Sequence, residues 1–120
     1  MRFLIVDDSK MARKAVSRCI REAALGELVI EEAPDGLTAL KQIAQSSPDV
    51  LLTDWNMPHM SGLELARHVR SADAAIRIGF ITSEGTDAMR HDAVESGADF
   101  FITKPFSPEA LKAALEAVRR

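Results

Sequence analysis

The sequence predicts an α/β fold, a doubly wound sheet of five parallel strands, from two observations. Short apolar runs alternate along the chain with segments whose apolar residues recur at helical spacing. Each helical segment is joined to its strands by short loops, which is typical of parallel strands connected by right-handed crossovers. We expect one domain over residues 1–120, because a chain of this length buries a single hydrophobic core.

The five predicted strands are short, and two of them are unusual. Residues 28–33 are polar enough for a sheet edge, whereas residues 76–81 contain Arg77 and Gly79, which are uncommon inside a central strand. The other three are continuous apolar runs of the kind found in buried parallel strands, at residues 3–6, 50–53 and 100–103.

Capping residues indicate where the predicted helices begin. Ser61 with Glu64 three residues later is a capping box, and the helix that it opens continues to about Arg70. Ser107 followed by proline supplies an N-cap and a first helical residue. The remaining three helices are predicted after Ser9, after the turn at residues 34–36, and over about residues 86–96.

Charged residues follow three of the apolar strands. Asp7 and Asp8 follow the first, Asp54 follows the third, and Lys104 follows the last. Parallel strands present their carboxyl ends at one edge of the sheet, where ligands bind, so these side chains should meet there. Clustered carboxylates repel one another unless a cation or a proton intervenes, and hard oxygen ligands favour Mg²⁺. The sequence therefore predicts a magnesium site.

Such a site can also hold a phosphoryl group. The metal and the Lys104 ammonium can neutralise the phosphoryl oxygens, and Thr82 or Ser83, at the end of the fourth strand, can donate a hydrogen bond to them. One carboxylate could then act as a nucleophile and form an acyl phosphate. Asp54 is the favoured nucleophile because it stands alone on its strand.

Four motifs stand in order along the chain: Val-Asp-Asp-Ser at 6–9, Asp-Trp-Asn-Met-Pro at 54–58 with Gly62, Ile-Thr-Ser at 81–83, and Lys-Pro-Phe at 104–106. Together they resemble the receiver domain of two-component response regulators, most closely the single-domain chemotaxis type. The resemblance covers the whole chain and implies a flavodoxin-like sheet with strand order 2-1-3-4-5, which is known for a chemotaxis regulator.

The resemblance implies a role for each acidic residue. Asp54 would accept a phosphoryl group from a histidine kinase or a phosphotransfer protein, as part of a signalling module and not as an enzyme. Mg²⁺ would be bound by Asp8, by Asp54 and by the backbone carbonyl of Asn56, with Asp7 assisting largely through water.

The resemblance also implies a switch. Thr82 and Lys104 would contact the phosphoryl oxygens, and the movement of Thr82 would be followed by an inward turn of Phe101. Chemotaxis regulators usually carry tyrosine at this position, and an aromatic residue on a strand is also commonly plain core. The same resemblance implies a cis peptide between Lys104 and Pro105.

Composition and charge set limits on the partners. The chain has 15 Lys and Arg against 18 Asp and Glu and no basic run, so nothing in its charge suggests a nucleic-acid partner, and we expect none. We expect a cytoplasmic monomer without a membrane segment, in which Cys19 fills the core.

The target protein would bind the face formed by the fourth helix, the last strand and the final helix. The basic residues of the first helix are predicted to form a solvated face near the kinase: Lys10, Arg13, Lys14, Arg18 and Arg21.

Particular residues disfavour three other functions. A hydrolase with an aspartyl-phosphate intermediate usually has an acid two residues after its nucleophile, where this chain has Asn56. A flavodoxin-like electron carrier would need small hydroxylated residues in the first loop, where Asp7 and Asp8 would repel the phosphate of FMN. A degenerate receiver used as a structural partner would lack some site residues. The end of the chain at residues 119–120 leaves open a receiver domain cut from a larger regulator.

Overall fold

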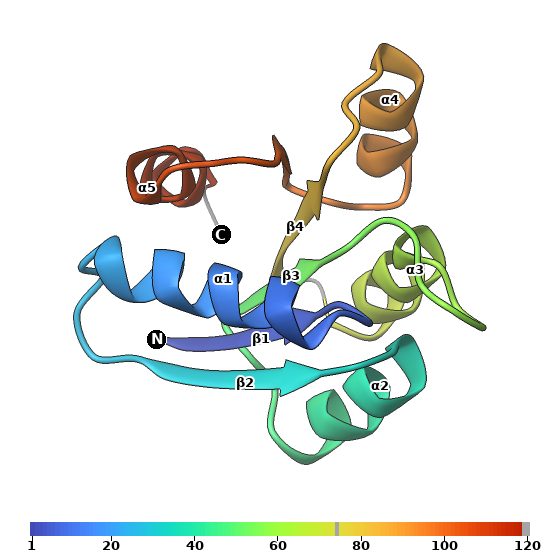
Figure 1. Cartoon of the computed structure of the whole chain (residues 1–120). Coiled ribbons are helices and arrows are strands. Elements are labelled where there is room, and N and C mark those ends of the chain that lie inside the picture. Colours follow the sequence, from blue (N-terminus) through green and yellow to red (C-terminus); the bar gives the residue numbers. More distant parts are fainter. Residues whose placement is uncertain (74, 119–120) are drawn as a thin grey trace.

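Strands and helices alternate without exception in the computed structural model, which describes residues 1–73 and 75–118 (Figure 1). The final Arg119 and Arg120 lie outside the described residues. In chain order the elements are β1 (Arg2–Val6), α1 (Lys10–Glu22), β2 (Val29–Ala33), α2 (Gly36–Gln45), β3 (Val50–Thr53), α3 (Gly62–Ala72), β4 (Arg77–Thr82), α4 (Asp87–Glu95), β5 (Phe100–Thr103) and α5 (Pro108–Ala117).

The strands form one parallel sheet in the order β2-β1-β3-β4-β5, which confirms the predicted topology. The register places Val6 beside Thr53, so the residues that follow them lie at the same edge of the sheet. The N–H of Asp54 donates to the carbonyl of Val6 at 2.9 Å and continues this pairing beyond the strands. The register alone therefore brings Asp7 next to Asp54.

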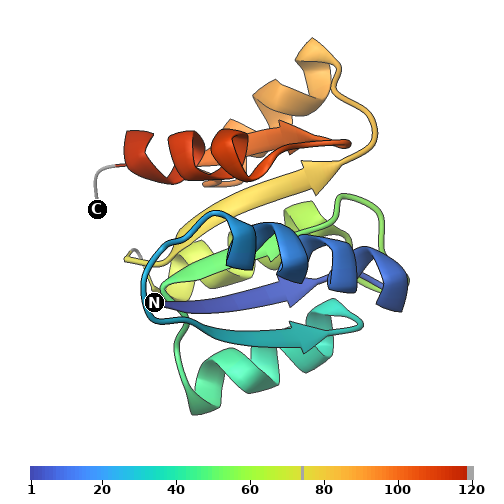
Figure 2. The same cartoon turned by 60° about the vertical axis from the view of Figure 1, so that its left-hand side comes forward.

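Helices cover both faces of the sheet (Figures 1 and 2). Because side chains alternate along a strand, Phe3 and Ile5 enter the core under α1 and α5, whereas Leu4 and Val6 enter the core under α2 and α3. All four of these β1 side chains are at most 2% exposed. Burying a side chain of this size stabilises a fold by about 1.5–3 kcal/mol, so the apolar runs position the strand ends firmly.

Helix caps account for where the helices begin. The side-chain oxygens of Ser9, Asp35, Ser61, Thr86 and Ser107 each accept a hydrogen bond from the backbone N–H three residues later. The predicted capping box at the start of α3 is complete, and α5 begins with the predicted serine and proline. The third helix extends two residues beyond the predicted end at Arg70.

The fourth strand is central and buried, although Arg77 and Gly79 made it an unusual candidate. Gly79 pairs with Phe100 on β5, and a Cβ at position 79 would lie 2.0 Å from the Phe100 ring. The aromatic ring thus occupies the space that a side chain would need. A glycine that weakens a strand on its own is required here by the neighbouring strand.

The described helices are short. The longest, α1, has 13 residues, which corresponds to about 20 Å at a rise of about 1.5 Å per residue. Spanning a bilayer takes roughly 20 predominantly apolar residues. None of the helices in the described part of the chain is long and apolar enough to cross a membrane.

Candidate metal centre

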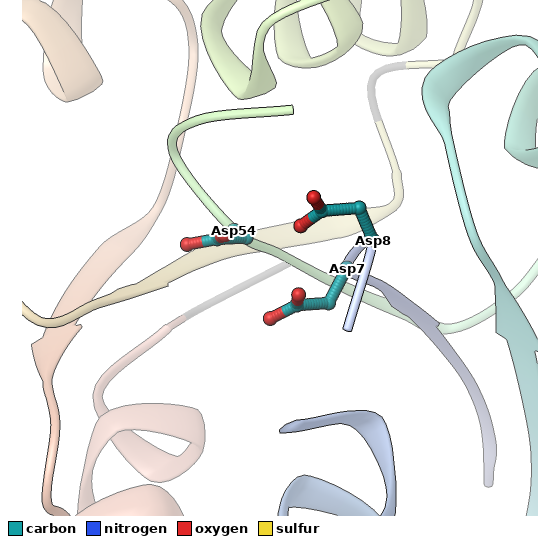
Figure 3. Close-up of side chains that lie close together, drawn as sticks. All are labelled: Asp7, Asp8 and Asp54. Carbon is teal, nitrogen blue, oxygen red and sulfur yellow. The ribbon is translucent and has the colours of Figure 1, made fainter. Parts of the chain in front are cut away.

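Three carboxylates gather at the carboxyl ends of β1 and β3. One oxygen from each of Asp7, Asp8 and Asp54 lies within 4.8 Å of the other two, and Figure 3 shows the three side chains side by side. Asp7 is 4% exposed, Asp54 is half-buried, and Asp8 is exposed. The predicted cluster is therefore present, with a closed side at Asp7 and an open side at Asp8.

The cluster carries an electrostatic cost that a cation would relieve. Burial raises the pKa of Asp54 above its ordinary value, and the charge of Asp7 raises it further. The backbone N–H of Trp55, which donates to Asp54 Oδ1 at 2.9 Å, and the Lys104 ammonium oppose this pKa rise only in part. The donor set consists of oxygens alone, which fits a hard divalent cation such as Mg²⁺.

Lys104 reaches the cluster from the end of β5. Its Nζ lies 3.4 Å from Asp7 Oδ2, and its side chain is 30% exposed. Its backbone N–H donates to the carbonyl of Thr82 at 2.7 Å, and the Lys104–Pro105 peptide is cis, as predicted. An ammonium at this position neutralises part of the charge of Asp7 and stays accessible to a ligand that enters from solvent.

Two further predicted site residues, Thr82 and Asn56, stand at the carboxyl ends of β4 and β3, Thr82 as the last residue of its strand and Asn56 in the loop after β3. Thr82 ends β4 and is 3% exposed, and its Oγ1 accepts a hydrogen bond from the N–H of Glu84 at 3.3 Å. Ser83, the alternative hydrogen-bond donor to a phosphoryl group, is exposed. Asn56 is exposed in the loop after β3, and the role of its carbonyl as a metal ligand stays a prediction.

Gly62 allows the start of α3 to approach the end of β3. A Cβ at this position would lie 2.2 Å from the backbone oxygen of Asp54 and 2.8 Å from the ring of Phe80. The N–H of Gly62 also donates to the carbonyl of Trp55 at 3.0 Å. Any side chain at position 62 would displace the backbone of Asp54.

Three aromatic rings connect the loop after Asp54 to β5. The Trp55 ring centroid is 4.9 Å from that of Phe80 and 5.8 Å from that of Phe101. The guanidinium of Arg90 on α4 lies 4.7 Å from the centroid of the Phe101 ring. Phe101 thus packs against the core, as a plain core residue would, and also contacts α4, as a switch residue would.

Arg13 corrects one sequence expectation, because it does not belong to a solvated face. Its side chain is 14% exposed, and its guanidinium donates to the backbone carbonyl of Asp7 at 2.6 Å and to Glu32 at 3.0 Å. Position 13 precedes the buried Val16 and Ser17 by three and four residues, so it falls on the buried stripe of α1. This spacing of three and four residues is the sequence signal that indicates the burial of Arg13.

Cys19 is a free, buried residue, which confirms its predicted place in the core. Burial raises the pKa of its thiol, with a smaller contribution from the charge of Glu22. A raised thiol pKa keeps sulfur protonated and poorly nucleophilic. Cys19 therefore adds no chemistry to the acidic cluster.

Comparison with known proteins agrees with this geometry. The family model described as the response regulator receiver domain matches residues 3–116. Chemotaxis protein CheY1 of Helicobacter pylori is 40% identical over 98% of this chain and 96% of its own length. Response regulator MprA of Mycobacterium avium is 35% identical, and this chain spans 51% of it. The structure of chemotaxis protein CheY4 of Vibrio cholerae has a TM-score of 0.86 and 33% identity, with 98% of each chain covered.

Proposed function

The chain belongs to the response regulator receiver domain family, and we propose that Asp54 is its phosphoacceptor in a two-component phosphorelay. The observation that carries this proposal is the position of Asp54 within 4.8 Å of two further carboxylates while its own pKa is raised by burial. Asp7 is buried and engaged by the Ser9 N–H at 2.9 Å and by Lys104. Asp54 is the more accessible nucleophile of the two.

In the proposed reaction, a carboxylate oxygen of Asp54 attacks the phosphorus of a phosphohistidine on the kinase or phosphotransfer protein. The phosphorus–nitrogen bond breaks, the histidine leaves with its electron pair, and an acyl phosphate forms on Asp54. The Trp55 N–H, at 2.9 Å from Asp54 Oδ1, fixes the orientation of the carboxylate. Positioning and charge neutralisation then carry most of the catalysis.

Asp7, Asp8, Asp54 and the backbone carbonyl of Asn56 would hold Mg²⁺. When bound, this ion supplies positive charge for the oxygens of the transferred phosphoryl group. Lys104 adds a second positive charge, since its Nζ already lies at the cluster, 3.4 Å from Asp7. In this arrangement the chain acts as a signalling module that assists its own phosphorylation and dephosphorylation.

Intact-mass analysis after incubation with acetyl phosphate and Mg²⁺ tests the phosphoacceptor. We expect a gain of roughly 80 Da, as one phosphoryl group requires. Asp54→Asn should abolish this gain, whereas the control Asp92→Asn, an exposed residue on α4, should retain it. Persistent labelling of the Asp54 variant would assign the phosphate to another residue.

We further propose that phosphorylation changes the surface formed by α4, β5 and α5, where a target protein would bind. Two observations support this surface: Phe101 contacts both Trp55 and Arg90, and α4 has few buried side chains. The hydroxyl of Thr82, 3.3 Å from the Glu84 N–H, would turn toward the phosphate and allow Phe101 to move inward. Phosphate can shift this equilibrium only by its differential affinity for the two states.

Hydrogen exchange with and without beryllofluoride, a phosphoryl mimic, tests the switch. We expect protection in residues 86–106 to change in the wild type. Thr82→Ala should still accept phosphate on Asp54 but change this protection much less. Unchanged protection in the wild type with Asp54 occupied would place the output elsewhere.

A role in chemotaxis is part of the proposal, because CheY1 of Helicobacter pylori matches over 96% of its length. The alternative is a receiver domain of a longer regulator, as in the match to MprA, of which the chain spans 51%. Deleting the gene should abolish spreading in soft agar if the chemotaxis role is right and leave it intact if the alternative holds. The cytoplasmic location and the monomeric state stay predictions.

A further inference from the structure

Arg13 reaches the acidic cluster from an unexpected element. It lies in the first turns of α1, and its Nη1 donates to the backbone carbonyl of Asp7 at 2.6 Å. Its Nε donates to Glu32 Oε1 on β2 at 3.0 Å, and the Arg13 and Glu32 side chains are 14% and 28% exposed. One guanidinium therefore joins α1, the end of β1 and the edge strand at the candidate metal centre.

The contacts of Asp7 explain why its carbonyl matters. Its N–H donates to Ala33 at 3.2 Å, and its carboxylate accepts from Ser9 and Lys104. The carbonyl oxygen belongs to the peptide that joins Asp7 to Asp8, and a peptide is planar. Holding this oxygen fixes the plane from which Asp8 departs.

Asp8 depends on that plane more than the other carboxylates do. It is exposed, and its carboxylate has no hydrogen-bond or ion-pair partner among residues 1–73 and 75–118. Asp54, in contrast, is held by the Trp55 N–H, and Asp7 by Ser9 and Lys104. The direction of the Asp8 side chain therefore follows from the backbone, and the backbone is held by Arg13.

We propose that Arg13 is a positioning residue of the metal centre, which directs Asp8 through the Asp7 carbonyl and is itself anchored by Glu32. This inference rests on the proposed function, because it concerns the residues that would hold Mg²⁺. The change in Mg²⁺ affinity that this role predicts on removing Arg13 is opposite in sign to the change that simple electrostatics predicts. Removing a positive charge near a cation site should strengthen Mg²⁺ binding, whereas losing a positioning contact should weaken it.

Titration with MgCl₂, followed by calorimetry and by fluorescence of Trp55, the single tryptophan of the chain, measures this effect. Arg13→Met should raise the Kd for Mg²⁺ about 10-fold, at the lower end of what losing an outer-shell partner of a metal ligand costs. Arg13→Lys keeps the charge but not the fork of donors, so it should raise the Kd similarly. Glu32→Gln should have a smaller effect in the same direction.

Arg2 and Glu31 provide a matched control. They form a 2.8 Å ion pair between β1 and β2, the edge strand that also carries Glu32, and Arg2 lies at the end of β1 away from the cluster. In metal-free buffer, Arg2→Met should lower the free energy of unfolding by no more than Arg13→Met does. It should change the Kd for Mg²⁺ less than 2-fold. A loss of Mg²⁺ affinity in Arg2→Met equal to that in Arg13→Met would overturn the proposal in favour of general loosening of the strands.

Two further outcomes contradict the positioning role. Arg13→Met with unchanged or tighter Mg²⁺ binding would mean that its charge, and not its geometry, acts on the site. Wild-type Mg²⁺ affinity in Arg13→Lys would likewise mean that the charge at position 13 acts on the site and that the fork of donors does not. If the wild-type protein bound no Mg²⁺, the proposed function would fail first, whereas wild-type binding with an unaffected Arg13→Met variant would overturn the positioning role alone.

The same role predicts a second readout. Labelling of Asp54 by acetyl phosphate should be slower in Arg13→Met at limiting Mg²⁺ and should recover at saturating Mg²⁺, because the metal then compensates for its weaker site. A defect in labelling that saturating Mg²⁺ does not reduce would also contradict the proposal.

Discussion

The acidic cluster and the α4–β5 side of the molecule are built in opposite ways. The cluster stands on β1 and β3, where the four residues of β3 are all buried and Asp7 is held at its N–H, its carbonyl and its carboxylate. Helix α4 has one buried residue, Ala93, and its Val94 is 72% exposed. In Figure 1, α4 projects beyond the compact arrangement of the other helices.

This difference fits the proposed function, which needs a rigid binding site and a movable surface in one domain. A site that binds a metal and a phosphoryl group needs fixed geometry, because small misplacements cost rate and affinity. A segment that changes on phosphorylation must instead be cheap to rearrange, and such segments come from the less stable parts of a fold. The aromatic rings of Trp55, Phe80 and Phe101 lie between the two regions.

The largest expected effect comes from breaking this connection at Phe80. Its side chain is fully buried and contacts both Trp55 and Phe101. Phe80→Ala should lower the free energy of unfolding by about 3–5 kcal/mol, as other large-to-small core changes do. Urea unfolding measures it, with the exposed Val94→Ala as a control that should stay within about 0.5 kcal/mol. Equal effects of the two substitutions would contradict the contrast between the regions.

A comparison of two glycines separates the cluster from the α4 side. At Gly62 a Cβ would meet the Asp54 backbone oxygen at 2.2 Å, whereas at Gly85 it would meet the methyl of Thr103 at 2.4 Å. A methyl-bearing side chain can move more easily than a backbone, so Gly62→Ala should cost about 1–3 kcal/mol and Gly85→Ala less. Only Gly62→Ala should also weaken Mg²⁺ binding. Chemical denaturation and MgCl₂ titration decide the matter, and a reversed order would be inconsistent with this packing.

Removing the contact between Arg90 and Phe101 should affect the α4 side alone. The guanidinium lies 4.7 Å from the ring centroid, and an exposed cation–π contact contributes about 0.5–1 kcal/mol. Arg90→Ala should therefore accelerate hydrogen exchange in α4 while the Kd for Mg²⁺ stays unchanged. Exposed Arg67→Ala, on α3, is the control for loss of a surface charge. Faster exchange around Asp54 in the Arg90 variant would show that the regions are not independent.

The smallest expected effect concerns the caps of α2 and α4. Asp35 caps α2, and the hydrogen bond from the Thr38 N–H, at 2.7 Å, holds the pKa of Asp35 below its ordinary value of 3.8. A depressed carboxyl pKa stabilises the fold above the unfolded pKa, and this contribution is lost as the pH falls through the folded pKa. Thr86, which caps α4, does not titrate in this range.

Asp35→Asn keeps a capping oxygen but removes the titration. The stability of the wild type relative to this variant should therefore fall between pH 6 and pH 3, as urea midpoints at the two pH values would measure. Thr86→Ser should show no such relative change. A relative stability of the wild type that rises toward pH 3 would mean that the Asp35 pKa is raised in the folded protein.

Patterns that depend on neighbours in the chain could be predicted from the sequence. The order of strands and helices, the serine caps and the apolar runs are local, because hydrogen bonds over three residues and burial of alternate side chains set them. The meeting of Asp7, Asp8 and Asp54 followed as well, since parallel strands must present their carboxyl ends at one edge.

The tertiary structure decided what depends on contacts between distant segments. Gly79 was an anomaly in sequence and became necessary only once the ring of Phe100 lay over it. Arg13 matched a solvated basic face in composition, yet the carbonyl of Asp7 and the carboxylate of Glu32 hold its guanidinium at the cluster. A local pattern determines which residues a strand or helix presents, whereas a charged or missing side chain acquires its role from a partner that only the folded chain brings near.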